Sequence, residues 1–296
     1  SRGLGDVYKR QVNGGRCNRG CTLSVVCEVG ITMSWLSALI AFPAIGAALI
    51  GILRSLNDKQ VRQLGVATSL ITLIVAIGML LQFDKNSTQA MQFSESYSWI
   101  SAFGVNFSLG VDGIALVLIV LAAILVPVVL VAGWNESEGH RGTVRQYVVL
   151  TLITEAMMMG VFAATDVFLF YVFFEAILIP MYFLIGRFGG QRSTYAAVKF
   201  LLYSLVGGLL MLVSLIGLWV QARQLTGVGT FDWATLTSLK IDSGIQNWLF
   251  LGFFIAFAIK APLFPFHTWL PDAAGEATPG SATLLVGVLD KIGTFG

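Results

Sequence analysis

Six ionisable side chains lie inside long apolar runs of this sequence. They are Glu155, Glu175, Lys199, Lys260, Asp290 and Lys291. A charged group inside a membrane is costly unless it is paired or hydrated, so ionisable residues in such segments mark ion pathways by default. Asp112 and Asp166 fall at the ends of apolar runs, where we expect a solvated or capping role. The six buried candidates are therefore the residues that could move protons or other ions.

Glu175 interrupts the apolar run FFEAILIPMYFLIGRF, and Pro180 follows five residues later. Two interpretations stay open for this carboxyl group. Burial favours the uncharged form of a carboxyl, so Glu175 would be neutral and hydrogen-bonded to a neighbouring helix. Alternatively, Glu175 is the partner of a cation that is equally rare in the apolar part of the chain, and Lys260 is such a cation.

Lys260 lies in the segment AIKAPLFPFHTWLP, in which two prolines follow it closely. A proline cannot donate to the carbonyl group four residues earlier, so Pro262 frees the carbonyl of Ala258 and Pro265 frees that of Ala261. We therefore predict a broken helix, and unwound backbone at membrane depth is typical of the ion sites of transporters. The structural alternative is that Lys260 extends its stem toward the membrane interface.

Three further candidates lie beyond the predicted break. His267 follows Lys260 by seven residues and is either an interfacial hydrogen-bonding residue or a relay between Lys260 and water. Asp290 and Lys291 are adjacent, so their side chains project about 100° apart and cannot both face one partner. Either they neutralise each other, or Lys291 forms a second proton site that is reached from Lys260.

Glu155 and Lys199 occupy two other apolar segments. One interpretation makes them polar groups that hold helices together, with Lys199 extending to the membrane surface. The other gives both residues a part in proton uptake. Their positions alone do not separate the two interpretations.

The composition requires lipid, rather than water, around most of the surface. Of 296 residues, 56% are hydrophobic and 11% are charged, and the mean hydropathy is +0.81, whereas a soluble domain carries about 25% charged residues. A helix needs about 20 apolar residues to cross a bilayer. Seven stretches qualify: 33–53, 61–83, 113–134, 146–165, 167–187, 195–221 and 247–270. An eighth begins near Ser281 and ends with the chain after 16 residues, about 24 Å of helix, too short to cross.

The sequence thus predicts an all-α polytopic membrane protein with a broken seventh helix and a truncated eighth. Alternate short loops hold seven Lys and Arg residues against three in the others, which places the N-terminus outside the cytoplasm. The long connections 84–111 and 222–246 are polar, and we expect extracytoplasmic loops with hairpin structure there. A net charge of +2 without a basic patch excludes a nucleic-acid partner.

Residues 1–32 differ from the rest of the chain. They hold all three cysteines, Cys17, Cys21 and Cys27, and lack the apolar core of a signal peptide. A metal site would need a fourth ligand, and a disulfide would leave one thiol over. We expect a non-native leader, with Met33 as the start of the native chain.

Two stretches carry a close family resemblance: FFEAILIPMYFLIGRF and AFAIKAPLFPFHTWLPDAAGEATPGSATLLVGVLDKIGTFG. From about Met33 to Gly296 the sequence resembles the antiporter-like chain M subunits of proton-translocating NADH:quinone oxidoreductase, or respiratory complex I. The resemblance implies a fold of about fourteen helices with two inverted repeats that hold broken helices. Residues 33–134 would then be the first three helices, and 146–296 the first repeat without part of its last helix.

The resemblance also implies roles for individual residues. Glu175 and Lys260 would be the carboxylate and lysine of the first half-channel, Lys291 the lysine of the central axis and His267 a connecting polar group. Asp290, directly before that lysine, departs from the usual pattern of the family. It makes the charge state of Lys291 harder to assign.

We therefore expect part of a proton-pumping membrane subunit of the bacterial plasma membrane. The chain shows no cysteine-rich cluster motif, dinucleotide-binding loop or haem-type histidine pair. We accordingly expect no cofactor in this chain; NADH, FMN, iron–sulfur clusters and quinone would bind partner subunits, and the chain would contact other membrane-arm subunits and lipid. The close alternative is a subunit of a multisubunit Na+/H+ antiporter or a membrane-bound hydrogenase. A passive membrane scaffold is the alternative of a different class.

Overall fold

The computed structural model describes residues 34–87, 89–138 and 141–296, and residues 34–296 form one compact unit. Within the described part, seven helices are long and apolar enough to cross a membrane, which confirms the predicted fold class. The expected leader 1–32 and its cysteines lie outside the described residues. The division of the rest at 134 and 146 stays a prediction.

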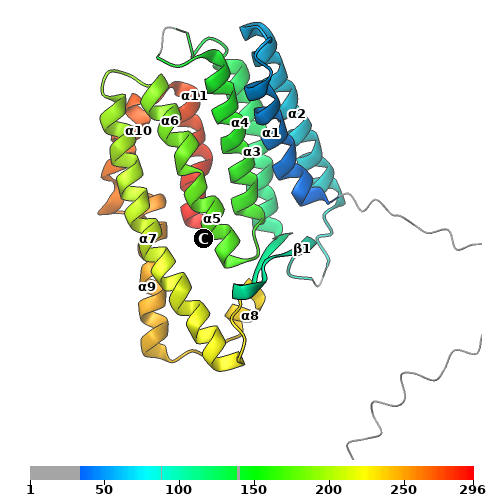
Figure 1. The fold of residues 1–296 in the computed structure, drawn as a ribbon, viewed down its shortest axis with the longest axis vertical. Helices are drawn as coiled ribbons and strands as arrows, with labels where there is room; N and C mark the ends of the chain where they lie inside the picture. The colour runs from blue at the N-terminus through cyan, green and yellow to red at the C-terminus, as the bar shows by residue number, and fades with distance from the viewer. Residues whose placement is uncertain (1–33, 88, 139–140) are drawn as a thin grey trace, which may run out of the picture. The chain divides into compact units, whose positions relative to one another are not determined.

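The first four long helices pack side by side (Figure 1). They are α1 (Trp35–Ile52), α2 (Asp58–Gln82), α3 (Gly113–Ala132) and α4 (Val144–Ala163). α4 packs against the other three, and it is the most deeply buried of the seven spanning helices. It therefore lies between the other three helices of this group and the helices that follow it in the chain.

The second group begins with α5 (Val167–Ala176) and α6 (Leu178–Phe188), which together make the fifth span. The long α7 (Ser193–Thr226) packs against α6 and against α9 (Ser243–Lys260). α7 is longer than the predicted span 195–221, since Arg223 lies over the Trp219 ring at 5.5 Å and the helix continues to a left-handed Gly227. Its 34 residues correspond to about 51 Å.

One of the two long connections contains the predicted hairpin. Strands β1 (Gln92–Ile100) and β2 (Val105–Val111) pair antiparallel around η1 (Ser101–Phe103). The expectation is wrong for 222–246, which forms the short helix α8 (Trp233–Thr237). The reason is local, because the Asp232 carboxylate accepts from the Thr235 backbone N–H at 2.8 Å and caps this turn.

The aspartates at the span ends act as predicted. Asp112 accepts from the backbone N–H of Ala115 at 2.7 Å and caps α3. Asp166 accepts from the N–H of Leu169 at 3.0 Å and caps α5, and its second oxygen accepts from the N–H of Asn106 at 3.0 Å. Burial raises the pKa of the Asp166 carboxyl, while these backbone donors act in the opposite direction.

The predicted break in the seventh span is confirmed. α9 ends at Lys260, and the chain resumes as η2 (Phe266–Thr268) and α10 (Trp269–Glu276). The carbonyl of Ala258 does not stay free as predicted, because it accepts from the N–H of Leu263 at 2.8 Å. In addition, the indole Nε1 of Trp269 donates to the carbonyl of Ile259 at 2.8 Å. The unwound segment is thus held by specific hydrogen bonds.

Two further irregularities were not predicted. The fifth span changes from α5 to α6 at Ile177, three residues before Pro180, which has no N–H to offer to Ala176. The eighth span consists of α11 (Pro279–Leu284), a π-helical segment, η3 (Leu285–Leu289), and α12 (Asp290–Phe295). π segments within helices are rare and occur frequently at functional sites.

A loop residue fixes the start of the eighth span. Glu136, in the connection after α3, accepts from the backbone N–H of Gly280 at 2.9 Å and from the hydroxyl of Tyr147 at 2.9 Å. Thr278 caps the same helix by accepting from the N–H of Ser281. The first turn of α11 is therefore tied to α4 through these contacts.

The turn between α1 and α2 is held from α4 by Arg145. Its Nη1 donates to the carbonyls of Ile50 at 2.5 Å and Leu53 at 2.6 Å, and its Nη2 donates to that of Leu56 at 2.9 Å. These carbonyls belong to the end of α1 and the turn after it. A single guanidinium therefore satisfies acceptors that the helix leaves unpaired.

We expect Arg145→Lys to lower the free energy of unfolding by about 2 kcal/mol, because one ammonium cannot reach all of these carbonyls. The apparent melting temperature of the complete protein in detergent is the measurement. Arg54→Lys is the matched control, since the exposed Arg54 side chain makes no hydrogen bond within the described residues. Equal melting temperatures for the two variants would contradict the role of Arg145.

Candidate functional site

Lys260 is the most deeply buried cation that the structure describes. It is the last residue of α9 and is 2% exposed. Its Nζ lies 4.6 Å from the ring centroid of Phe174 and 6.0 Å from that of Phe200. Within the described residues Nζ has no hydrogen-bond partner. The ammonium is therefore held by aromatic faces and by more distant charges, and not by a direct ion pair.

Glu175 approaches Lys260 from a different element. It lies one residue before the end of α5 and two residues before the irregularity at Ile177, and its carboxylate interacts electrostatically with Lys260. The backbone of α7 approaches it closely, since a Cβ atom at Gly208 would overlap the Glu175 carboxylate. The structure thus brings together the two residues that the sequence predicted as partners.

A third ionisable group, Asp290 of α12, belongs to the same cluster. It is 8% exposed and interacts electrostatically with Lys260. Its neighbour Lys291 lies on the exposed side of the helix, with Nζ 3.4 Å from the carbonyl of Val286. The sequence predicted that the two side chains cannot both face one partner, and in the structure Asp290 is the one that interacts with Lys260.

Lys199 and Lys260 have very different surroundings. The Nζ of Lys199 forms a salt bridge of 2.7 Å with Asp272 of α10 and donates to the carbonyl of Thr268 at 2.8 Å. The side chains of Lys199 and Asp272 are 21% and 37% exposed. Sequence reasoning missed Asp272 as a partner, although it follows directly on the Leu-Pro pair of the broken span. Lys199 thus ties α7 to the helix beyond the break.

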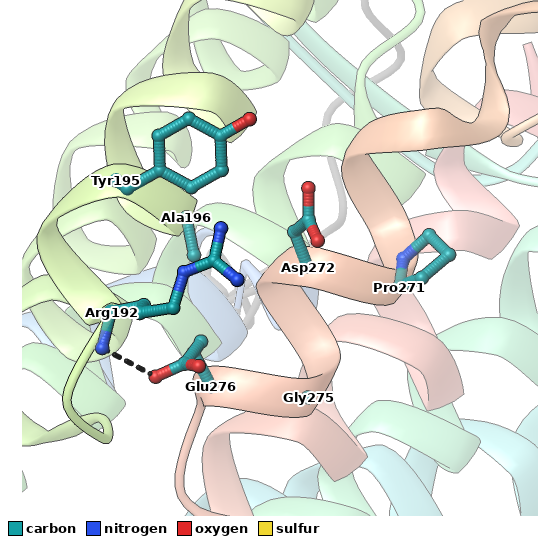
Figure 2. Close-up of a pocket in the computed structure, with 7 residues that line it drawn as sticks. All are labelled: Arg192, Tyr195, Ala196, Pro271, Asp272, Gly275 and Glu276. Carbon is teal, nitrogen blue, oxygen red and sulfur yellow. Dashed lines mark hydrogen bonds between the residues drawn. The ribbon is translucent and has the colours of Figure 1, made fainter.

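A small open cavity of about 160 Å³ lies beside this salt bridge, between the start of α7 and α10. It is lined by Arg192, Tyr195, Ala196, Pro271, Asp272, Gly275 and Glu276. Figure 2 shows the Arg192 side chain between the Tyr195 ring and the Glu276 carboxylate, which accepts from the Arg192 backbone N–H at 2.9 Å. None of Glu175, Lys260 and Asp290 lines this cavity.

Within the described residues, the two remaining candidates form no hydrogen bond with the cluster through their buried polar atoms. His267 is half-buried in η2, with its ring 5.8 Å from that of Phe264, and its buried Nδ1 has no partner within the described residues. Glu155 is 0% exposed in α4, and neither of its oxygens has a hydrogen-bond partner in the described part of the chain. Their roles in proton transfer stay predictions.

The chemistry that this cluster permits is proton exchange. A buried ammonium faces two carboxylates that come from other helices, and each of the three groups can hold or release one proton. In the part of the chain that the structure describes, no three His, Cys, Asp or Glu side chains gather as they would around a metal ion. Backbone irregularities lie at or next to this cluster in α5, α9 and the eighth span.

A family model and several known proteins match this chain. Residues 164–296 match the model of the NADH:quinone oxidoreductase/Mrp antiporter transmembrane family. The chain is 47% identical to NADH-quinone oxidoreductase subunit M of Mycobacterium tuberculosis, with 88% of this chain and 53% of that protein covered. It is 38% identical to NADH-ubiquinone oxidoreductase chain 4 of Arabidopsis thaliana, with 88% and 51% covered.

Solved structures of other proteins have the same fold. A chain of respiratory complex I from Thermus thermophilus matches with a TM-score of 0.75 and 33% identity, over 88% of this chain and 51% of that one. A chain of the Mrp complex from Dietzia sp. matches with a TM-score of 0.73 over 88% and 27%, and its 23% identity shows the fold alone. The chain spans about half the length of the curated relatives it matches.

We expect Gly208→Ala to destabilise the protein by about 1–3 kcal/mol, because the added methyl group overpacks the contact with Glu175. In a Glu175→Ala background the cost should fall, since the overlapping carboxylate is gone. Apparent melting temperatures of the four combinations measure this coupling. Gly51→Ala, where a Cβ would meet nothing within 4 Å, is the control; additive effects at 208 and 175 would show that the two residues are not in contact.

Proposed function

Because the chain belongs to the NADH:quinone oxidoreductase/Mrp antiporter family of membrane subunits, we propose that it is part of a proton-translocating subunit of NADH:quinone oxidoreductase. The observation that carries the proposal is the buried Lys260 ammonium, which lies at a helix break, faces Glu175 and has no hydrogen-bond partner within the described residues. Ionisable groups in such places are typical of ion pathways.

The proposed mechanism uses the charge of Glu175 to control the proton on Lys260. A buried ammonium is stabilised by a nearby carboxylate and is disfavoured by its low-dielectric surroundings. When Glu175 is ionised, Lys260 holds its proton; when Glu175 is neutralised or moves away, Lys260 releases it. The aromatic faces of Phe174 and Phe200 stabilise the cation without supplying an acceptor for its proton.

The other candidates receive supporting roles in this proposal. Lys199, with its partner Asp272, lies at the exposed end of α7 and would take part in proton uptake together with Glu155. His267, on the far side of the break, would connect Lys260 to water. Lys291, on the exposed face of α12, would be the next lysine along the membrane.

Electron transfer would take place in partner subunits. We propose no cofactor for this chain, and NADH, FMN, iron–sulfur clusters and quinone would bind elsewhere in the complex. Other membrane-arm subunits and lipid would surround the chain. The proposed location is the bacterial plasma membrane, with the N-terminus extracytoplasmic, because basic residues gather in the loops that would face the cytoplasm.

The complex I assignment is preferred over the antiporter alternative for a specific reason. The relative at 47% identity is named as a subunit of NADH-quinone oxidoreductase, whereas the likeness to the Mrp complex rests on 23% identity. A passive scaffold remains a different class of function. It is separated from a pump by variants that keep assembly but remove a single titratable charge.

We expect Glu175→Gln to abolish most proton translocation while the complex still assembles, because the amide keeps the shape but cannot carry the charge that controls Lys260. Formation of a pH gradient in proteoliposomes is the measurement, with subunit content determined in parallel. Asp58→Asn is the control, since Asp58 is an exposed carboxylate on α2. A gradient at the wild-type level in the Gln variant would count against the proposal.

Lys260→Arg separates a proton carrier from a fixed counter-charge. Arginine keeps a positive charge beside Glu175 but stays protonated in proteins, so we expect both Lys260→Arg and Lys260→Ala to stop pumping, with assembly retained at least in the Arg variant. If Lys260 were only structural, Arg would preserve function and Ala would destabilise the protein. Lys59→Arg, at an exposed lysine, is the control, and near wild-type pumping by Lys260→Arg would exclude the carrier role.

A further inference from the structure

Asp290 is a buried carboxylate to which neither the family pattern nor the mechanism above gives a role. It is the first residue of α12 and is 8% exposed. Its Oδ1 has no hydrogen-bond partner within the described residues. The adjacent Lys291 interacts with Asp290 electrostatically but forms no direct ion pair with it within the described residues, since its Nζ lies on the exposed side, 3.4 Å from the carbonyl of Val286. A carboxylate that is buried in this way is costly unless a charge compensates it, so its presence suggests a function.

α12 packs against α9, and the face of α12 that carries Asp290 lies against the end of α9. One turn after Asp290, a Cβ atom at Gly293 would lie 2.9 Å from the Cβ of Ala261 and 2.8 Å from the carbonyl oxygen of Phe257. Residues three apart lie on the same face of a helix, so the face that carries Asp290 lies against the residues on either side of Lys260. The electrostatic interaction of Asp290 with Lys260 agrees with this placement.

Lys260 therefore interacts with two carboxylates that come from different helices. Glu175 belongs to α5 and Asp290 to α12. The two differ in their connection to the surface. Glu175 is half-buried and packs against α7 at Gly208, whereas Asp290 is buried but is adjacent in the chain to Lys291, which is exposed.

We propose that Asp290 accepts the proton that Lys260 releases and passes it on toward the face of α12 that carries Lys291. The proposal rests on the proposed function and adds a further proton-carrying residue to it. In the step, an N–H bond of the Lys260 ammonium breaks and an O–H bond forms on the Asp290 carboxylate. Both groups become neutral, and no other reactant is needed. The transfer takes place at hydrogen-bonding distance or through one water molecule.

The direction of this step follows from burial. Two opposite charges that are taken out of water are both penalised, and their mutual attraction offsets only part of this cost; moving the proton between them removes both penalties at once. An ionised Glu175 opposes the transfer because it stabilises the ammonium, and a neutral Glu175 permits it. Glu175 would therefore control when the proton leaves, and Asp290 would determine where it goes.

The test uses Asp290→Asn and Asp290→Glu in the complete subunit within the assembled complex. We expect Asn to lower the rate of proton pumping by about tenfold or more at unchanged subunit content, because it cannot accept a proton, and Glu to retain most of the rate. Asp58→Asn is the matched control at an exposed aspartate. If the Asn variant does not assemble, Asp290→Ser replaces it. A loss of pumping by the Ser variant would support the proposal, and full pumping would overturn it.

A double variant distinguishes a proton acceptor from a structural residue. Because Lys260→Ala is itself expected to stop pumping, complex stability is the readout: if Asp290 acts on the proton that Lys260 releases, adding Asp290→Asn to Lys260→Ala should cause no further loss of stability. Full pumping by the Asn variant, or an additional loss of stability in the double variant, would overturn the proposal. If Lys260→Ala itself pumped normally, the proposed function would fail first, so the two failures are distinguishable.

Discussion

The burial of one ammonium group constrains the arrangement of four helices. Lys260 is 2% exposed, and a lone cation at such depth requires charges or polar groups close by. Glu175 on α5, the aromatic rings of Phe174 and Phe200, and Asp290 on α12 are the groups that the structure supplies. Because they belong to α5, α7 and α12, these helices must approach the end of α9 together.

The backbone is irregular close to each of the three ionisable residues of the cluster. The chain departs from α-helical geometry at Ile177, after Lys260 and along Leu285–Leu289, which are the positions next to the three ionisable residues. At each place the backbone gains freedom to turn a side chain, and it loses hydrogen bonds that must be replaced. The Trp269 indole and the Leu263 N–H replace two of them after Lys260.

The sequence predicts the spans well because length and hydropathy decide which segments enter a membrane. It also predicts the break after Lys260, since Pro262 and Pro265 act on the backbone directly. Pro180 is a similar signal in the sequence, and it accounts for the irregularity at Ile177. The π segment Leu285–Leu289 carries no such signal, because it depends on how the eighth span packs.

The orientation of Asp290 and Lys291 could not be predicted from the local sequence. Adjacent residues on a helix differ by about 100°, so a π segment, which accommodates one extra residue, rotates everything after it by about that angle. Counting along the sequence from Ser281 therefore cannot determine which residue faces Lys260. The close contact of Gly293 with Ala261 does determine it, and that contact is a property of the folded chain.

The two lysines of this region then separate by environment rather than by type. Lys199 forms a short salt bridge with Asp272 at a partly exposed surface. Water there stabilises the ammonium even when Asp272 moves away. Lys260 has aromatic faces and carboxylates around it but no direct acceptor within the described residues, so its charge depends on groups that can themselves change. A lysine that must stay charged fits the first setting. A lysine that gives up its proton when a neighbouring carboxylate is neutralised requires the second, which supports placing the transfer step at Lys260.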